Sequence, residues 1–211
     1  MKEILIADDH SIVRIGTTML IKEVIGSNSN IDEAATFDQA LIKLKEKHYD
    51  LILLDINIPG GNNLDMINAI KIRNNKVKIL VFSSYDENIY AVRYIQAGAN
   101  GYLWKESGEE EFKKAINTIL SGTIYLSDAI KEQKVADFLN NKPDQNALQS
   151  LSNREIEVAN LMVKGLSTTE ISQTLHIRLN TVSTYKAHIF SKLGVHNLVE
   201  LIEKMKLLNY F

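Results

Sequence analysis

Apolar residues in the first 121 positions fall into short runs separated by longer amphipathic stretches. Five runs have the length and composition of strands: 3–8, 30–36, 50–55, 77–83 and 101–104. The intervening stretches repeat apolar residues at helical spacing, near 11–25, 37–48, 63–74, 86–97 and 107–120. Strands that alternate with helices predict an α/β fold, a doubly wound, flavodoxin-like parallel sheet of five strands with helices on both faces. We take residues 1–121 as this first domain.

The pattern changes after residue 121. The stretch 127–139 (SDAIKEQKVADFL) is a candidate linker helix, and the polar stretch after it contains one of the two prolines of the chain. We therefore predict a partly helical linker at 122–147. The remaining residues, 148–211, carry helical patterns only, near 153–164, 168–175, 181–193 and 196–208. Capping boxes, SNRE at 152–155 and STTE at 167–170, mark two helix starts and predict a small all-α domain of four helices.

Charge and composition narrow the function classes. The net charge of −2 divides unevenly: residues 148–211 hold seven Lys/Arg against five Asp/Glu, which leaves −4 for residues 1–147. Only the C-terminal segment therefore has a charge that suits DNA, and only mildly. No apolar run reaches the roughly 20 residues that span a bilayer, and acids interrupt the N-terminus where an export signal needs apolar residues. Zero cysteines exclude disulfides and thiolate metal sites and fit a reducing cytoplasm.

Polar side chains follow four of the five predicted strands. They are Asp8 and Asp9 after the first strand, Asp55 after the third, Ser83 and Ser84 after the fourth, and Lys105 after the fifth. The carboxyl ends of these strands meet at one edge if the strand order is 2-1-3-4-5. Three carboxylates and one ammonium leave about −2 charge, which a hard cation such as Mg²⁺ relieves. Asp55 then has the position of a nucleophile, and Lys105 and a serine hydroxyl have that of donors to a phosphoryl group.

At these residues the sequence resembles the receiver domain of two-component response regulators. The matching motifs are ADD (7–9), LLDINIP (53–59), VFSS (81–84) and GYLWK (101–105), in the right order over about the first 120 residues. The resemblance implies a partner histidine kinase that phosphorylates Asp55. It implies Mg²⁺ held by Asp9, Asp55 and the carbonyl of Asn57, with Asp8 assisting through water. It implies that Ser83 and Lys105 grip the phosphoryl oxygens and that Tyr102 is the aromatic switch. Asn63 stands where the family usually has glycine.

Residues 151–202 resemble the LuxR-type helix-turn-helix domain, and the two domains together resemble the NarL/FixJ subfamily. In the predicted helix 181–193, Val182, Tyr185, Ile189 and Leu193 share the inward face. The opposite face offers Ser183, Thr184, Ala187 and His188 to a DNA major groove, while Arg178, Thr181, Lys186 and Lys192 are placed for phosphates. Arg178 replaces the usual Ser/Thr cap of this helix, and Asn180 is an alternative cap that would shorten it.

We therefore predict a DNA-binding response regulator that is switched by phosphorylation of Asp55 and acts as a dimer. Its partners are a histidine kinase, double-stranded DNA and a second copy of the chain, with RNA polymerase as a further candidate and no membrane partner. It is not an enzyme beyond its own phosphotransfer and autodephosphorylation. Two alternatives are a regulator that ignores phosphorylation and uses the receiver only to dimerise, and a C-terminal bundle used only for dimerisation. A haloacid dehalogenase-type phosphohydrolase would need a second acid where Asn57 stands.

Overall fold

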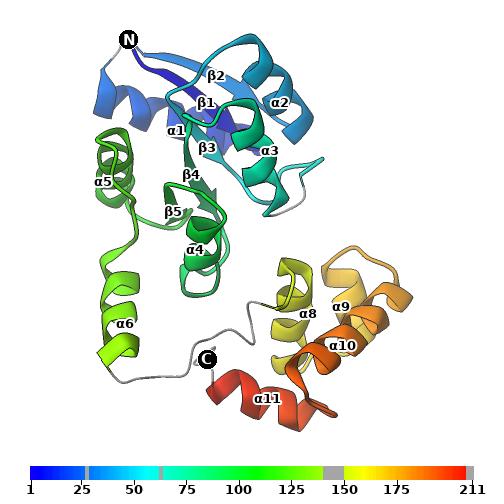
Figure 1. Ribbon diagram of the computed structural model, residues 1–211. Coiled ribbons are helices and arrows are strands. Elements are labelled where there is room, and N and C mark those ends of the chain that lie inside the picture. Colours follow the sequence, from blue (N-terminus) through cyan, green and yellow to red (C-terminus); the bar gives the residue numbers. More distant parts are fainter. Residues whose placement is uncertain (27–28, 62–63, 140–149, 208–211) are drawn as a thin grey trace. The chain divides into compact units, whose positions relative to one another are not determined.

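The structure is a computed structural model, and it describes residues 1–26, 29–61, 64–139 and 150–207. The chain folds into two compact units, which divide between residues 140 and 141 (Figure 1). The N-terminal unit is built on a β-sheet, and the C-terminal unit consists of helices. Within the described residues, no helix has both the length and the apolar composition needed to cross a membrane.

The N-terminal unit is built on a five-stranded sheet. Its strands are β1 (Glu3–Ala7), β2 (Asn30–Ala34), β3 (Leu51–Leu54), β4 (Lys78–Ser83) and β5 (Gly101–Trp104). All neighbouring strands are parallel, in the order β2-β1-β3-β4-β5. The doubly wound parallel sheet predicted from the sequence is therefore confirmed, including the strand order that brings the polar strand ends to one edge.

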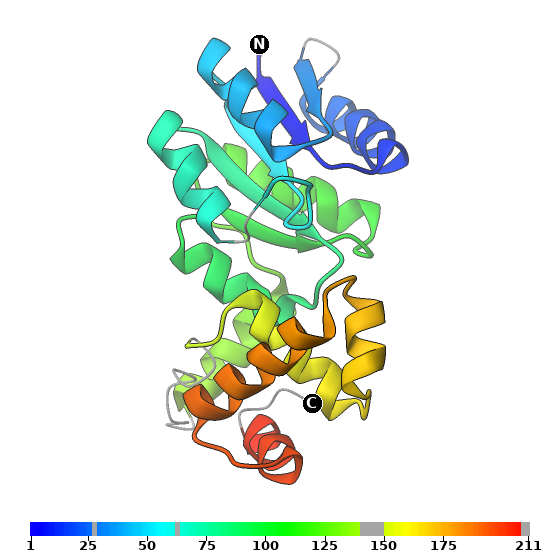
Figure 2. The same cartoon turned by 90° about the vertical axis from the view of Figure 1, so that its right-hand side faces the viewer.

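Five helices cover the two faces of this sheet. They are α1 (Ser11–Ile25), α2 (Phe37–Glu46), α3 (Asp65–Arg73), α4 (Glu87–Gln96) and α5 (Glu109–Leu120). Helices α1 and α5 lie together on one face, and α2, α3 and α4 lie on the other (Figures 1 and 2). This arrangement leaves the middle strands without a solvent face, which is why Leu51–Leu54 is apolar and buried at every position.

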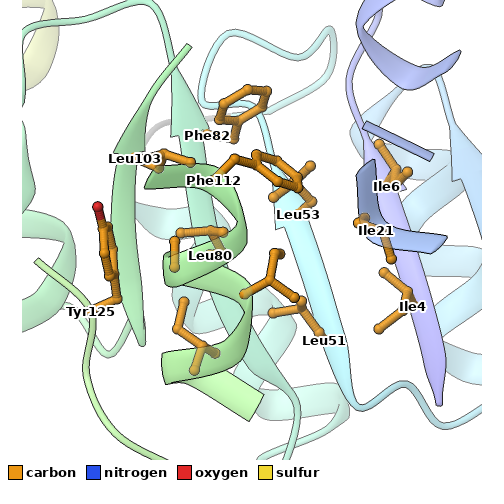
Figure 3. Packing of buried hydrophobic residues seen from close by; sticks show 13 residues of the cluster. Ile4, Ile6, Ile21, Leu51, Leu53, Leu80, Phe82, Leu103, Phe112 and Tyr125 are labelled. Carbon is orange, nitrogen blue, oxygen red and sulfur yellow. The ribbon is translucent and has the colours of Figure 1, made fainter. Parts of the chain in front are cut away.

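The face under α1 and α5 carries a continuous apolar core. Alternate strand residues point into it and meet Ile21 of α1 and Phe112 of α5, as Figure 3 shows. The strand residues are Ile4, Ile6, Leu51, Leu53, Leu80, Phe82 and Leu103. Burying one such side chain contributes about 1.5–3 kcal/mol. A one-residue slip of a strand would turn these residues away from the core, so the core fixes the register of the strand ends.

After α5 the chain returns to the sheet edge before it forms α6 (Asp128–Leu139). Tyr125 forms an isolated parallel bridge with Gly101 of β5. The stretch 127–139 predicted as a candidate linker helix contains α6, which falls within the N-terminal unit. The part of the predicted linker at 140–147, like the glycine-replacing Asn63, lies outside the described residues.

The C-terminal unit contains α8 (Asn153–Val163), α9 (Thr168–Thr174), α10 (Leu179–Leu193) and α11 (Leu198–Leu207). Both predicted capping boxes form, Ser152 with Glu155 and Ser167 with Glu170. Helix α10 begins two residues earlier than predicted. Arg178 occupies its N-cap position and, among the described residues, makes no side-chain cap bond. Asn180 lies inside the first turn, so the helix is not shortened.

Candidate functional site

The carboxyl ends of the strands hold the predicted acidic residues in register. Ala7 and Leu54 are paired across β1 and β3, and the amide of Asp55 donates to the carbonyl of Ala7 at 2.8 Å. The amide of Lys105 donates to the carbonyl of Ser83 at 2.7 Å. Because backbone bonds continue one residue beyond each strand, the side chains of Asp55 and Lys105 start from fixed positions.

Lys105 lies between two buried carboxylates. Its ammonium is 2.7 Å from Oδ2 of Asp8 and 2.8 Å from Oδ2 of Asp55. The side chains of Asp8, Asp55 and Lys105 are 3%, 4% and 11% exposed, so these charges are shielded from water. Burial raises the pKa of Asp55, against the opposing hydrogen bond from Lys105. Burial lowers the pKa of Lys105, but its bonds to Asp55 and Asp8 outweigh burial, so the pKa is raised.

Asp9 and His10 complete an acidic cluster at this edge. Single ligand atoms of Asp8, Asp9, His10 and Asp55 all lie within 4.8 Å of one another. Nδ1 of His10 is 2.8 Å from Asp9 Oδ1 and 3.1 Å from Asp8 Oδ1. Three carboxylates at this spacing supply the hard oxygen donors that Mg²⁺ prefers, so the residues fit that ion. When bound, the ion would neutralise negative charge at the cluster.

The sequence indicated Ser83 and Tyr102 but not Tyr85, whose backbone both side chains bond. Ser83 is 1% exposed, and its Oγ accepts from the amide of Tyr85 at 3.1 Å. Tyr102 is fully buried and donates to the carbonyl of Tyr85 at 2.9 Å. The hydroxyl of Tyr85 donates to Oδ1 of Asn57 at 3.1 Å, across the edge from β4 to β3. Trp104 donates its indole N–H to the carbonyl of Ser84 at 3.2 Å.

We call the strand ends that carry Asp8, Asp9, Asp55 and Lys105 the acidic edge. The sequence did not indicate that His10, Tyr85 and Trp104 lie next to it. The spacing of His10 to the other histidines fits no metal site, so it gives no signal of its own. Its side chain is 63% exposed, yet one ring nitrogen faces two carboxylates. The run Asp8–Asp9–His10 was the available signal, because all three residues follow one strand end.

In the C-terminal unit, α10 has the two faces that its sequence indicated. Val182, Ile189 and Leu193 are buried, and Tyr185 is half-buried. The opposite face is exposed at Ser183, Thr184, Ala187 and His188. The hydroxyls of Ser183 and Thr184 donate to carbonyls four residues earlier, at 3.3 and 3.0 Å. Arg178 is exposed, Thr181 and Lys186 are half-buried, and Nζ of Lys186 lies 5.5 Å from the ring centroid of Phe190.

Lys192 has a partner inside the domain. Its ammonium donates to both carboxylate oxygens of Glu155, at 3.0 and 2.7 Å. Glu155 is 2% exposed and also accepts from the amide of Ser152 in the capping box of α8. Burial opposes ionisation of Glu155, but the bonds from Lys192 and Ser152 outweigh it and lower its pKa. Lys192 thus joins the C-terminal part of α10 to the start of α8.

Two family models match the chain. Residues 4–117 match the response regulator receiver domain, and residues 149–205 match the bacterial regulatory proteins of the luxR family. The Fimbriae Z protein of Salmonella typhimurium is 35% identical over 209 residues, which cover 96% of this chain and 95% of that protein. The oxygen regulatory protein NreC of Staphylococcus aureus is 32% identical over 223 residues, which cover 99% of this chain and 100% of that protein.

Solved structures share the fold. RcsB from Salmonella enterica serovar Typhimurium, bound to promoter rprA in the presence of the phosphomimetic BeF₃⁻, superposes with a TM-score of 0.63 at 22% identity. This match covers 98% of this chain and 99% of that chain. A LuxR-family response regulator from Aurantimonas gives a TM-score of 0.59 at 29% identity, over 65% of this chain and 97% of that chain.

The chain belongs to the two-component response regulators. A receiver domain joined to a LuxR-type helix-turn-helix domain makes it a NarL/FixJ-type member with a DNA-binding domain, a regulator rather than an ordinary enzyme. The resemblance stated from the sequence motifs is confirmed.

Proposed function

We propose that this protein is a transcription regulator that accepts a phosphoryl group on Asp55 from a histidine kinase. The observation that carries the proposal is the buried carboxylate of Asp55, held at the carboxyl edge of the sheet beside Asp8 and the ammonium of Lys105. An ordinary surface aspartate would not be kept among buried charges, since an unneeded buried charge is costly. The geometry therefore favours chemistry at Asp55 over a structural role.

In this mechanism an oxygen of Asp55 attacks the phosphorus of a phosphohistidine on the kinase. A P–O bond to Asp55 forms while the P–N bond to the histidine breaks. Lys105 is already within hydrogen-bonding distance of Asp55 and can transfer its bond to a phosphoryl oxygen. Asp9 and Asp55, with the carbonyl of Asn57 and assistance from Asp8, would hold Mg²⁺, which offsets the negative charge of the entering group.

Phosphorylation adds roughly −1.5 to −2 charge beside Ser83. We infer that the Ser83 hydroxyl turns to the phosphoryl group and that Tyr102 and the surface around α4 and β5 repack. The altered receiver would then dimerise or release the DNA-binding domain. The exposed face of α10 would enter the major groove, with Ser183, Thr184, Ala187 and His188 near base edges. Arg178, Thr181, Lys186 and Lys192 would lie near phosphates. Zero cysteines and a DNA target suit a cytoplasmic location.

The phosphoacceptor assignment has a direct test. Incubation with acetyl phosphate and Mg²⁺ should add one acid-stable, base-labile phosphoryl group to the wild type and none to Asp55→Asn. Asp38→Asn is a matched control, since Asp38 is an exposed aspartate in the first turn of α2. Full labelling of Asp55→Asn would refute the assignment.

The dimer is tested on DNA. The C-terminal unit carries few positive charges, so one copy makes few phosphate contacts and binds weakly. We expect the phosphorylated full chain to protect two half-sites about one helical turn apart. Footprints and genome-wide binding maps that are the same for wild type and Asp55→Ala would instead favour a regulator that ignores phosphorylation.

A further inference from the structure

The segment that follows α5 is fastened to the edge of the sheet. The amide of Tyr125 donates to the carbonyl of Asn100 at 2.9 Å, and its hydroxyl donates to Glu111 of α5. Tyr125 is 1% exposed. A Cβ at Gly101 would come within 3.2 Å of the Cβ of Tyr125 and 2.6 Å of Ile119, so the close approach requires glycine there. The chain therefore reaches α6 from a fixed point on β5.

The first residues of α6 are tied to two different helices. The hydroxyl of Ser127 donates to Oε1 of Glu87, the first residue of α4, at 2.8 Å. Oγ of Ser127 also accepts from the amide of Ile130 at 3.3 Å, as a cap of α6 does. Asp128 is paired with Lys114 of α5 at 2.7 Å. Ser127 thus joins α6 to α4, while Asp128 joins it to α5.

Glu87 in turn follows the loop that lines the acidic edge. Residues 84–86 are held to β5 by two side-chain donors, Tyr102 to the carbonyl of Tyr85 and Trp104 to the carbonyl of Ser84. Ser83 accepts from the amide of Tyr85. Two residues further on, Glu87 bonds Ser127. A displacement of this loop by a few tenths of an ångström is enough to lengthen a 2.8 Å bond beyond its favourable range.

We propose that the bond between Glu87 and Ser127 is a latch that holds the start of α6 while Asp55 is unphosphorylated. The inference rests on the proposed phosphoacceptor role of Asp55. When the Ser83 hydroxyl turns to the phosphoryl group, it no longer accepts from Tyr85, so the loop and the first turn of α4 shift. Glu87 then leaves Ser127, while the ion pair of Asp128 with Lys114 remains. Since the chain runs through α6 toward the DNA-binding unit, this release passes the state of the acidic edge to the linker.

Hydrogen exchange of the full chain tests the latch. The readout is the exchange rate of amides 131–136, which lie within α6. Glu87→Ala removes the acceptor, and Ser127→Asp keeps a capping oxygen but sets a like charge against Glu87. Each should accelerate exchange about fivefold, as expected for the loss of one hydrogen bond. Glu87→Gln keeps an acceptor, and Glu110→Ala removes a carboxylate from the exposed first turn of α5, so both should stay near the wild-type rate.

The second arm adds BeF₃⁻ with Mg²⁺ as a phosphoryl mimic. The single tryptophan, Trp104, lies beside Lys105 and bonds the same loop, so its fluorescence reports that the mimic has reached the acidic edge. BeF₃⁻ should accelerate exchange in α6 of the wild type about as much as Glu87→Ala does, and should add nothing to Glu87→Ala.

Three results would overturn the latch. Exchange in Glu87→Ala and Ser127→Asp at the wild-type rate would show that the contact does not hold α6. A Trp104 response to BeF₃⁻ without faster exchange in the wild type would show that the acidic edge acts elsewhere. If BeF₃⁻ changes neither readout, the phosphoacceptor assignment fails and the latch with it, and faster exchange in the variants then reports a structural contact only.

Discussion

The acidic edge of the receiver and the exposed face of α10 are both groups of polar side chains on rigid elements, but they differ in how those side chains are held. At the acidic edge, Asp8, Asp55 and Lys105 are almost completely buried, and both carboxylates pair with Lys105. On α10, Ser183 and Thr184 are exposed, and their hydroxyls donate to carbonyls of their own helix. The first group finds its partners within the chain, and the second is proposed as one side of a DNA interface.

This difference follows from what each group is proposed to bind. A phosphoryl group and a small cation need donors and acceptors converging from several strands, and a sheet edge supplies them before the ligand arrives. A DNA groove is wide and brings its own hydrogen-bonding pattern, so a single helix face is sufficient. Changes at the acidic edge should therefore affect folding and chemistry together, while changes on the α10 face should affect DNA binding alone.

The largest effect is expected from Lys105→Ala. Removing one partner of a buried ion pair leaves Asp8 and Asp55 uncompensated and should lower the free energy of unfolding by about 3 kcal/mol in the absence of divalent ions. Millimolar Mg²⁺ should recover part of this loss, because a cation replaces the ammonium. Denaturant unfolding with and without Mg²⁺ measures both effects. Lys113→Ala is the control, a lysine paired with Glu23 and Glu109 at the surface, and an equal loss there would contradict the argument.

Glu155 of the DNA-binding domain is a buried carboxylate paired with a lysine, as Asp55 is at the acidic edge. Glu155→Gln removes a buried charge that Lys192 and Ser152 both bond, so we expect a loss of about 2 kcal/mol in that domain. Glu170→Gln alters the matching capping box of α9, which is exposed, and should cost less. The melting temperatures of the wild type and the two variants measure these losses. Equal decreases in the two variants would mean that the burial of Glu155 does not matter for stability.

The pH dependence of the same residue has a definite sign. A carboxyl group whose pKa is lower in the folded than in the unfolded state stabilises the fold above its unfolded pKa, and this contribution is lost as pH falls through the folded pKa. The pKa of Glu155 is lowered from 4.5, so its contribution should be complete above that pH and decline below it. Unfolding between pH 7 and pH 3 should therefore depend less on pH in Glu155→Gln. A curve parallel to that of the wild type would disprove this assignment.

The acidic edge could be predicted from the sequence because a few general rules determine where the ends of parallel strands lie. Asp55 closes one of the predicted strands of a parallel sheet, so it lies at the carboxyl edge. The strand order then brought Asp8 and Lys105 to the same place. Long-range side-chain bonds were not predictable in this way. Tyr85 reaches Asn57 across 28 positions, and no periodicity encodes such a contact.

In the C-terminal domain the helices were predictable because capping boxes and apolar spacing are local signals. The start of α10 was not, because Arg178 lacks a capping oxygen and the helix begins at Leu179 without one. Tertiary packing of Val182 and Ile189 stabilises the helix in place of a cap. The contact from Lys192 to Glu155 was also missed, because it joins residues 37 positions apart. A basic residue near the predicted DNA surface was more simply interpreted as a phosphate contact.

A smaller effect is expected from Mg²⁺ itself. Binding only to the folded state adds RT ln(1 + [L]/Kd), about 1.4 kcal/mol at ten times the dissociation constant. Melting temperature should therefore rise with millimolar Mg²⁺ in the wild type. Asp9→Ala removes an exposed carboxylate of the cluster and should abolish most of the rise. Asp65→Ala, a carboxylate on α3 outside the cluster, should keep it. An undiminished rise in Asp9→Ala would place the ion elsewhere.

The smallest effects are expected on the face of α10, and they separate base contacts from phosphate contacts. Thr184 is exposed on the outward face, so Thr184→Ala should change the preference at one base pair by about 1 kcal/mol without changing stability. Lys186→Ala should weaken binding evenly across sequences and reduce the salt slope by about one. Lys192→Ala should reduce that slope less, because its ammonium already neutralises Glu155 inside the domain. Binding to a set of operator variants at several salt concentrations measures all three. If Lys192→Ala instead reduces the salt slope by as much as Lys186→Ala and leaves stability unchanged, this lysine contacts DNA rather than stabilising the fold.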